Sequence, residues 1–364
     1  MATNKNQHFV PRCYLKMFTL DNEDKSINIF NVDRAKVIVG APVKNQCSGD
    51  YFYGKDPLLE SSIQAVEGPY SPIIRSVHEQ GYTLLEEHAM SLKEFWLFQY
   101  MRTEAASKRS VEMTNEMADI IDRDGNYGYD FRLKIKDAVN FAVKRFPEAV
   151  QQIYDLKICL VRNNSEIPFV TSDDPAILTN RWHLQYFKRR GFSFGLVNSG
   201  VIGMLPLSPA VLLVIYDSDV YSLDKKNGWV NIKKDSEIKL LNQHQYLNCI
   251  ANIFIGEKYD PGILLDSYTD VAKSKPKQRH RLHHAILDRE EDGCRTYKKV
   301  TMEEASLHRQ VMVHTETVHP SPSKWASLFR WRVGGTAFSN GTGVGYVRRA
   351  FAYDETRPFA KVKI

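Results

Sequence analysis

Apolar residues recur at three- and four-residue spacing through the first half of the chain, which predicts helices there. Asp56-Pro57 favours a helix start, with Asp as the N-cap and Pro at the first helical position, and Gly68-Pro69 predicts the end of that helix. Ser91 opens a capping box, and the helix that follows is expected to run past Arg109. A further helix is predicted from Leu133 to Phe146.

Shorter apolar blocks, typical of strands, lie on both sides of this helical segment. An extended entry at residues 8–18 ends in one helical turn, and a final helix is predicted at 243–255. The expected strands are 27–32 paired with 36–43, a hairpin of 156–161 with 167–171, and either a strand pair or one long strand at 205–216. Because helices come first and most strands later, the pattern predicts an α+β fold with an N-terminal β element, a central helical segment and an antiparallel β-sheet region.

The last quarter of the chain differs from the rest. Residues 274–284 are polar and basic and contain Pro276, which indicates a linker or an exposed loop. From Trp325 onward, aromatic residues separated by glycines predict short antiparallel strands. We therefore expect two domains, residues 1–272 and a basic, β-rich C-terminal module at residues 273–364.

Composition agrees with a folded protein, since 43% of the residues are hydrophobic and 25% are charged. No apolar run approaches the roughly 20 residues that a bilayer span requires, and the N-terminus lacks the pattern of a signal peptide. We expect a cytoplasmic protein without a membrane partner. The five cysteines are scattered and form no C-x-x-C pair, which argues against a disulfide framework and a thiolate zinc site.

Positive charge is concentrated at the C-terminal end. Residues 273–364 hold 18 Lys and Arg against 9 Asp and Glu, a net of +9, whereas residues 1–272 have a net of −3. Basic residues interleaved with aromatic rings suit phosphate contact and base stacking, although the outer face of an ordinary sheet has the same composition. The predicted nucleic-acid contacts are Lys275, Lys277, Arg279, Arg281, Arg330, Arg332, Arg348 and Arg349.

Arg102 is the first candidate for chemistry, because it lies on a predicted helix face that otherwise carries apolar residues. A buried guanidinium needs an anion, and Glu60, Glu67 and Asp173 are the internal candidates. A bound phosphate is the external one. A structural ion pair and a ligand-binding role both remain open.

Three motifs resemble a known family. They are His8-Phe-Val-Pro11-Arg-x-Tyr14-Leu15 with Phe18, Gln99-x-x-Arg102-Thr103, and Phe169-Val-Thr171-Ser172-Asp173-x-Pro175. Together they are similar to the DUF4238 domain family over roughly residues 5–270. The chain departs from the family pattern, with Cys13, Glu104 and Asp174 at positions where the family often has an aromatic residue, Pro and Asn. Proteins of this kind also occur in bacterial phage-defence loci, so the resemblance implies an immune effector or sensor.

The family motifs single out His8 and Asp173. Asp173 is expected at a strand end, where metal-binding carboxylates often project, although the same residues also fit a turn before proline. His8 is a candidate base or metal ligand, against the alternative of a structural histidine. Glu60 and Glu67 are about two helical turns apart, which permits both to reach one pocket but is also usual for a solvated face.

The leading hypothesis is a phage-defence protein that cleaves nucleic acid as a metal-dependent nuclease or phosphodiesterase. In it His8, Arg102 and Asp173 are catalytic, Glu67 and Asp173 bind Mg²⁺ or Mn²⁺, and the basic tail holds the substrate. The alternative, from another class, is a non-catalytic sensor whose pocket recognises a phage component or a nucleotide. Both hypotheses require distant segments to meet around Arg102.

Overall fold

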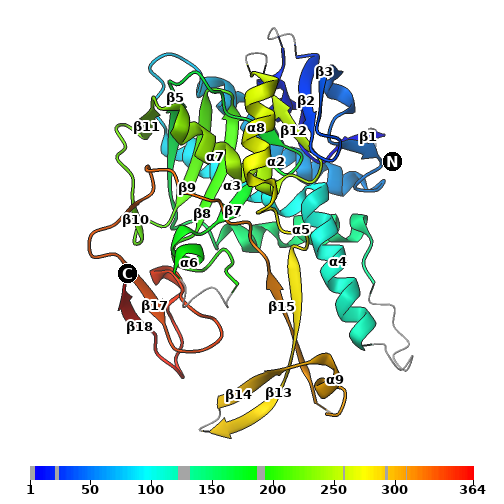
Figure 1. The fold of residues 1–364 in the computed structure, drawn as a ribbon, viewed down its shortest axis with the longest axis vertical. Coiled ribbons are helices and arrows are strands. Elements are labelled where there is room, and N and C mark those ends of the chain that lie inside the picture. The colour runs from blue at the N-terminus through cyan, green and yellow to red at the C-terminus, as the bar shows by residue number, and fades with distance from the viewer. Residues whose placement is uncertain are drawn as a thin grey trace.

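The described residues up to 50 form the small β element that the sequence pattern predicts. β1 (Asn6–His8) pairs with β4 (Ser48–Asp50), and β2 (Ser26–Asn31) pairs with β3 (Lys36–Pro42). The short helices α1 (Arg12–Leu15) and η1 (Lys16–Phe18) follow β1. The protein is described by a computed structural model, which places residues 5–20, 24–121, 132–186, 193–256, 259–291, 294–308 and 310–364 (Figure 1).

The described residues form an α+β fold. Its helices are α1 (Arg12–Leu15), α2 (Pro57–Ser76), α3 (Glu86–Arg102), α4 (Glu104–Ile121), α5 (Ile135–Val150), α6 (Arg181–Gln185), α7 (Asp235–Asn248), α8 (Pro261–Ala272) and α9 (Met302–Ala305), with 3-10 turns η1 (Lys16–Phe18), η2 (Val43–Asn45) and η4 (Arg349–Phe351). The N-terminal strands are β1 (Asn6–His8), β2 (Ser26–Asn31), β3 (Lys36–Pro42) and β4 (Ser48–Asp50). The central strands are β5 (Lys157–Asn163), β6 (Thr171–Ser172), β7 (Ile177–Thr179), β8 (Ile202–Ser208), β9 (Val211–Tyr216), β10 (Tyr221–Ser222), β11 (Trp229–Ile232) and β12 (Asn252–Ile255). The C-terminal strands are β13 (His280–Glu291), β14 (Cys294–Val300), β15 (Met312–Thr317), β16 (Arg330–Trp331), β17 (Thr336–Ser339) and β18 (Ala360–Lys363).

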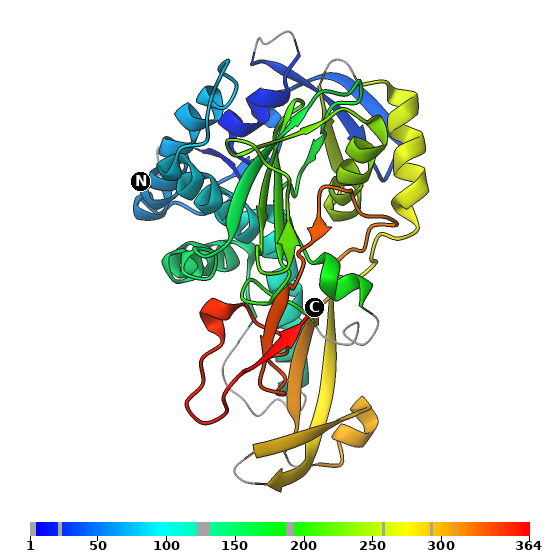
Figure 2. The ribbon, with the colours of Figure 1, turned by 90° about the vertical axis from the view of Figure 1, so that its left-hand side faces the viewer.

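The body is layered around a five-stranded sheet of order β11-β5-β9-β8-β7, in which only the β11–β5 pair is parallel. Figure 2 shows the N-terminal helices on one side of this sheet and α7 and α8 on the other. Both faces are buried, because Leu213 and Ile215 of β9 join one apolar cluster while Leu212 and Val214 join another. A second sheet, β3-β2-β12-β6, brings the N-terminal strands beside a strand from the end of the body.

Helix α2 is longer than its sequence predicts. It begins after the N-cap Asp56, as expected, but continues through Gly68, Pro69 and Pro72 to Ser76. Two prolines remove two backbone donors from the helix. Burial beyond them offsets this loss, since the ring of Tyr70 stacks on Phe95 at 3.4 Å and the two isoleucines that follow, Ile73 and Ile74, are buried.

The single helix predicted from Ser91 to beyond Arg109 is two helices. The backbone of Thr103 is extended, with ψ at 161°, and the Thr103 hydroxyl accepts a hydrogen bond from the amide of Ala106. Thr103 therefore ends α3 and caps α4. This break turns α4 away from α3, so that Arg109 and Arg102 lie on different helices.

Two other predictions were wrong. Residues 156–171 do not form a hairpin: β5 pairs with β9 and β11, whereas β6 joins β12 in the other sheet. The helix predicted at 243–255 is instead the end of α7 followed by β12. In the first case the chain leaves one sheet for the other after β5, and in the second the helix ends at Asn248, where the sequence predicted that it continues.

The C-terminal quarter has two parts. Strands β14-β13-β15 form a sheet that projects from the body, and the predicted loop at 274–284 is partly strand, because β13 begins at His280 (Figures 1 and 2). Farther along, Ala326, Leu328, Phe329 and Ala337 join the second apolar cluster of the body. The division into domains at residue 272 stays a prediction.

Candidate functional site

A polar pocket of about 390 Å³ lies where β1, α1 and α2 meet. Residues far apart in the sequence line it: Asn6, Gln7, His8, Arg12, Cys13, Lys44, Tyr53, Glu60, Ile63, Gln64 and Glu67. We call this set the N-terminal pocket. It brings together two of the predicted site residues, His8 and Glu67, and the two carboxylates whose helical spacing allowed a shared pocket.

Gln7 fixes one wall of the N-terminal pocket. Its side-chain oxygen accepts from the amide of Tyr53 at 2.7 Å, and its side-chain nitrogen donates to the carbonyl of Gly54 at 3.0 Å. β1 is thereby joined to residues 53–54, directly before α2. The wall is held by hydrogen bonds between the buried Gln7 side chain and backbone groups, so the positions of His8 and Tyr53 depend little on solvent-exposed side chains.

Arg102 is fully buried and contacts residues that line the N-terminal pocket. Its guanidinium donates to the carboxylate of Glu67, to the hydroxyl of Tyr53 and, at 3.2 Å, to the backbone carbonyl of His8. It also lies over the ring of Phe98, 4.7 Å from the centroid. The anion that the sequence demanded for Arg102 is thus Glu67, and the cation ties three walls of the pocket together.

His8 is half-buried, and its Nε2 atom is buried without a hydrogen-bond partner among the described residues. Burial lowers the pKa of His8 from its ordinary value of 6.5, and the charges of Arg12 and Arg102 act in the same direction. A backbone hydrogen bond with Lys44 opposes this shift. The neutral imidazole is therefore favoured at pH 7, and its Nε2 accepts no hydrogen bond from the described residues.

Two other groups of the N-terminal pocket have shifted pKa values. Burial raises the pKa of Glu67 above 4.5, against the opposing effect of Arg102. Burial, followed by the charge of Glu67, raises the pKa of Cys13 to about 11. Cys13 is therefore a thiol at neutral pH, which makes it a poor nucleophile.

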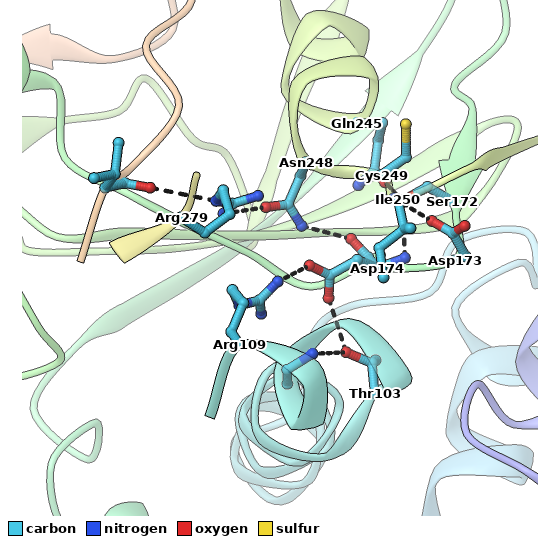
Figure 3. A network of polar contacts seen from close by, with 12 residues as sticks. Thr103, Arg109, Ser172, Asp173, Asp174, Gln245, Asn248, Cys249, Ile250 and Arg279 are labelled. Atoms are coloured by element: carbon cyan, nitrogen blue, oxygen red, sulfur yellow. Dashed lines mark hydrogen bonds and ion pairs between the residues drawn. The ribbon is translucent and has the colours of Figure 1, made fainter. Parts of the chain in front are cut away.

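Asp173 does not line this pocket, and the placement predicted for it was wrong. Its carboxylate accepts backbone hydrogen bonds from Ile250, Ala251 and Asn252 at 2.8 to 2.9 Å, of which Figure 3 shows the one from Ile250. These three amides follow the end of α7 and include the first residue of β12. Asp173 thus connects the β6–β7 segment to the α7–β12 turn, and Figure 3 shows it within a network of internal contacts.

Asp174, the neighbour that was not predicted as a site residue, is the centre of the same network. It is fully buried, and its two carboxylate oxygens accept from Thr103 at 2.9 Å and from Arg109 at 2.6 Å (Figure 3). Its backbone carbonyl accepts from Asn248 at 2.7 Å. Position 174 is the variable position of the third family motif, and the partners of Asp174 are spread along the chain, so the sequence pattern does not reveal them. The signal that could have found it is Arg109, a second cation near a helix start.

The eight basic residues predicted to contact nucleic acid are not equivalent. Arg348 is buried and binds Asp155 with two nitrogens, at 2.8 and 3.0 Å. Arg279 donates to Asn248 at 2.9 Å and to the carbonyl of Val318 at 3.3 Å. The prediction that Arg279 and Arg348 contact nucleic acid is therefore corrected, because both side chains bind groups within the protein.

The other six basic residues are more accessible. Lys275 is half-buried beside the carbonyl of Ile250, and Arg332 donates to the carbonyl of Ser218. Five of these side chains are exposed to solvent: Lys277, Arg281, Arg330, Arg332 and Arg349. They are distributed over the projecting sheet and the final strands, so they form a dispersed set and not a single groove.

Within the residues that the structure describes, no group of three or more His, Cys, Asp or Glu side chains is placed to hold a metal ion. Over the same residues, none of the helices combines the length and the apolar character that crossing a bilayer requires. The predicted partnership of Glu67 with Asp173 around one cation is corrected, since the two carboxylates serve different parts of the fold.

Comparison with known proteins identifies the family of this chain. Searches of curated proteins and of solved structures give no match. The model of the family described as "Protein of unknown function (DUF4238)" matches residues 6–258, slightly less than the span expected from the motifs. That span contains all of the N-terminal pocket and the whole Asp173–Asp174 network apart from Arg279. The chain belongs to the DUF4238 family.

Proposed function

We propose that the N-terminal pocket binds a phosphodiester group of a nucleic acid or nucleotide and that His8 acts there as a general base. The observation that carries the proposal is the Nε2 atom of His8, buried and without a partner among the described residues, in a neutral ring. A general base needs such a free lone pair, and because this atom is buried, the His8 ring has to turn toward the pocket for Nε2 to meet the attacking water. Arg12 and Lys44 supply positive charge on the same pocket wall.

The reaction is a hydrolysis. Nε2 of His8 takes a proton from water as the water oxygen bonds to phosphorus, and the bond from phosphorus to the leaving sugar oxygen breaks. The leaving oxygen takes a proton from solvent. Arg12 and Lys44 hold the non-bridging oxygens, whose charge increases in the transition state. Arg102 acts as a positioning residue, since it contacts the His8 carbonyl and Glu67 from below.

A divalent cation, Mg²⁺ or Mn²⁺, remains part of the proposal. Without Asp173, its carboxylate ligands have to come from Glu60 and Glu67, both of which line the pocket. One oxygen of Glu67 is already bound by Arg102. The assay below therefore runs with Mg²⁺, with Mn²⁺ and with a chelator.

The test measures cleavage of single-stranded DNA, single-stranded RNA and a small phosphodiester by the purified protein. His8→Gln keeps a polar side chain of similar reach and removes the base, so turnover is expected to fall about 10²- to 10⁴-fold. His314→Gln is the matched control, because His314 is exposed on β15 and lies outside the pocket. Equal turnover in the two variants refutes the role of His8.

Binding without turnover supports the other class of function, a sensor of a nucleotide or phage component. Ligand protection of the N-terminal pocket, with no cleavage under any metal condition, is the result expected of it. We further propose, on the family resemblance, that the protein acts in the cytosol in defence against phage. An infection assay with His8→Gln tests this role: loss of protection at unchanged protein level is expected.

A further inference from the structure

A second pocket, of about 350 Å³, lies at the root of the projecting sheet. It is lined by His183, Leu184, Phe194, Arg281, Glu316, Thr317, Val318, His319 and Ser321. We call it the root pocket. Some of its residues, in α6 and at position 194, lie within the family match. The others, in β13, in β15 and directly after β15, lie beyond residue 258. None of its residues belongs to the N-terminal pocket.

One wall of the root pocket is aromatic. The ring of His319 stacks on Phe194 with centroids 3.7 Å apart and an angle of 14°, and its Nε2 contacts the carbonyl of Phe194 at 2.9 Å. His183 meets the same Phe194 ring edge-on at 5.0 Å. Burial lowers the pKa of His319 to about 3, so the ring is neutral at pH 7. His319 thus supplies a flat ring, of the kind on which nucleobases stack, and no charge.

The other wall carries the charge. Arg281 of β13 is 62% exposed in its side chain, and its Nη1 is 4.0 Å from the carboxylate of Glu316. That carboxylate is already bound to His283 at 2.5 Å. The guanidinium of Arg281 therefore keeps donors that face solvent, in the geometry that suits a phosphate.

The surroundings of the root pocket add positive charge. Arg279 lies two residues before Arg281 on the same chain segment, and no carboxylate of the described residues is within 4.0 Å of it. Burial and then the nearby Arg109 lower the pKa of Arg279 to about 10. Asp174, the buried acid of this region, is already paired with Arg109. An anion in the root pocket would balance a charge that the protein leaves in excess.

We propose that the root pocket binds a nucleoside phosphate, with the base against the His319–Phe194 wall and the phosphate on Arg281. Its volume lies in the usual range for small-ligand sites, which starts at about 300 Å³. The unit recognised is the same in a free nucleotide and at the end of a nucleic-acid strand. Base stacking and a charge-assisted phosphate contact each contribute, so neither adenosine nor inorganic phosphate alone should bind as well.

Calorimetric titration of the full chain with AMP, adenosine, inorganic phosphate and a short single-stranded RNA tests the proposal. AMP is expected to bind, and Arg281→Ala should weaken it about tenfold. Arg289→Ala is the matched control: it lies on the same strand, is also 62% exposed, and has a glutamate at 3.8 Å. Equal weakening by both variants, or no binding of AMP and RNA, overturns the proposal.

Further titrations test the stacking contact separately and distinguish a free nucleotide from the end of a strand. His319→Ala should weaken AMP about tenfold, and His319→Phe should restore the stacking. Thermal unfolding checks that both variants fold; if His319→Ala does not, the arginine pair decides. If RNA binds much more tightly than AMP, a strand end is the ligand; if the two bind alike, a free nucleotide is. Repeating the titration in Arg12→Ala, which is expected to weaken phosphate binding at the N-terminal pocket alone, separates the two sites. An unchanged affinity for AMP assigns the binding to the root pocket, whether or not the proposed hydrolysis occurs, and a lowered affinity assigns it to the N-terminal pocket.

Discussion

The N-terminal pocket and the Asp173–Asp174 network are both built from buried polar residues of family motifs, yet they differ in what they leave unpaired. In the network, each carboxylate oxygen accepts a hydrogen bond from within the protein. In the pocket, the Nε2 of His8 and the Nε of Arg102 have no partner among the described residues. The comparison teaches that position in a motif does not by itself distinguish a structural residue from a candidate site residue, whereas an unused hydrogen-bonding group in a pocket marks a candidate.

Loss of the Asp174 carboxylate is the strongest way to test the network. Asp174→Ala leaves Arg109 and Thr103 without their acceptor, and removal of one partner from a buried pair should lower the free energy of unfolding by about 3–5 kcal/mol. Denaturant unfolding measures it. Asp119→Ala is the control, because its ion pair with Arg132 is exposed and should contribute less than about 1 kcal/mol. Similar losses in the two variants would contradict the central role of Asp174.

Asp173→Ala sharpens the comparison further. It leaves three backbone amides without an acceptor, so we expect unfolding to become easier by about 1–3 kcal/mol. Ligand binding and turnover at the N-terminal pocket should be unchanged in the folded protein. Loss of activity with unchanged stability would instead restore Asp173 as a catalytic residue, as the sequence first predicted.

Arg12→Ala tests the pocket from the opposite side. Arg12 is exposed, so its removal should change the free energy of unfolding by no more than about 0.5 kcal/mol. Affinity for a phosphodiester, measured by titration, should fall about tenfold, because a charge-assisted contact is lost. Lys36→Ala on β3, exposed and outside the pocket, should change neither. An equal effect of Lys36→Ala would indicate non-specific attraction.

The smallest expected effect is on pH dependence. The pKa of His8 is lowered from 6.5 by burial, so the folded protein binds this proton less readily than the unfolded chain does. The active, neutral form should therefore persist below pH 6.5, and the stability linked to His8 should decrease as pH falls through that value. A pH–rate profile measures the first, and unfolding of wild type beside His8→Gln measures the second. An acidic limb above pH 6.5 would contradict both.

Local signals predicted the elements they encode directly. The Asp56 N-cap and the strands around residues 205–216 were predicted because their causes lie within a few neighbouring residues. The ends at Pro69 and beyond Arg109 were wrong because tertiary contacts decided them: the Tyr70–Phe95 stack continues one helix, and the Asp174 contact of Thr103 interrupts another. Propensity gives way where packing contributes more.

The candidate site was predicted in part for the same reason. The need of Arg102 for a counter-charge follows from its place on an apolar helix face, and Glu67 does meet it. The partners of Asp173 are backbone amides of residues 250–252, which carry no side-chain signal. Lys44 and Tyr53 were missed because they follow no periodic pattern; only the fold brings them to His8.

The ion pair between Arg348 and Asp155 attaches the C-terminal segment of the chain to the body. The family match ends at residue 258. Phe329 lies beyond it in the sequence, yet it is fully buried in the apolar cluster that contains Leu212 and Val214 of β9. A relative made of the matched region alone must close this side of its sheet with other material, or with another molecule. The limits of the family match therefore do not coincide with the limits of this apolar cluster.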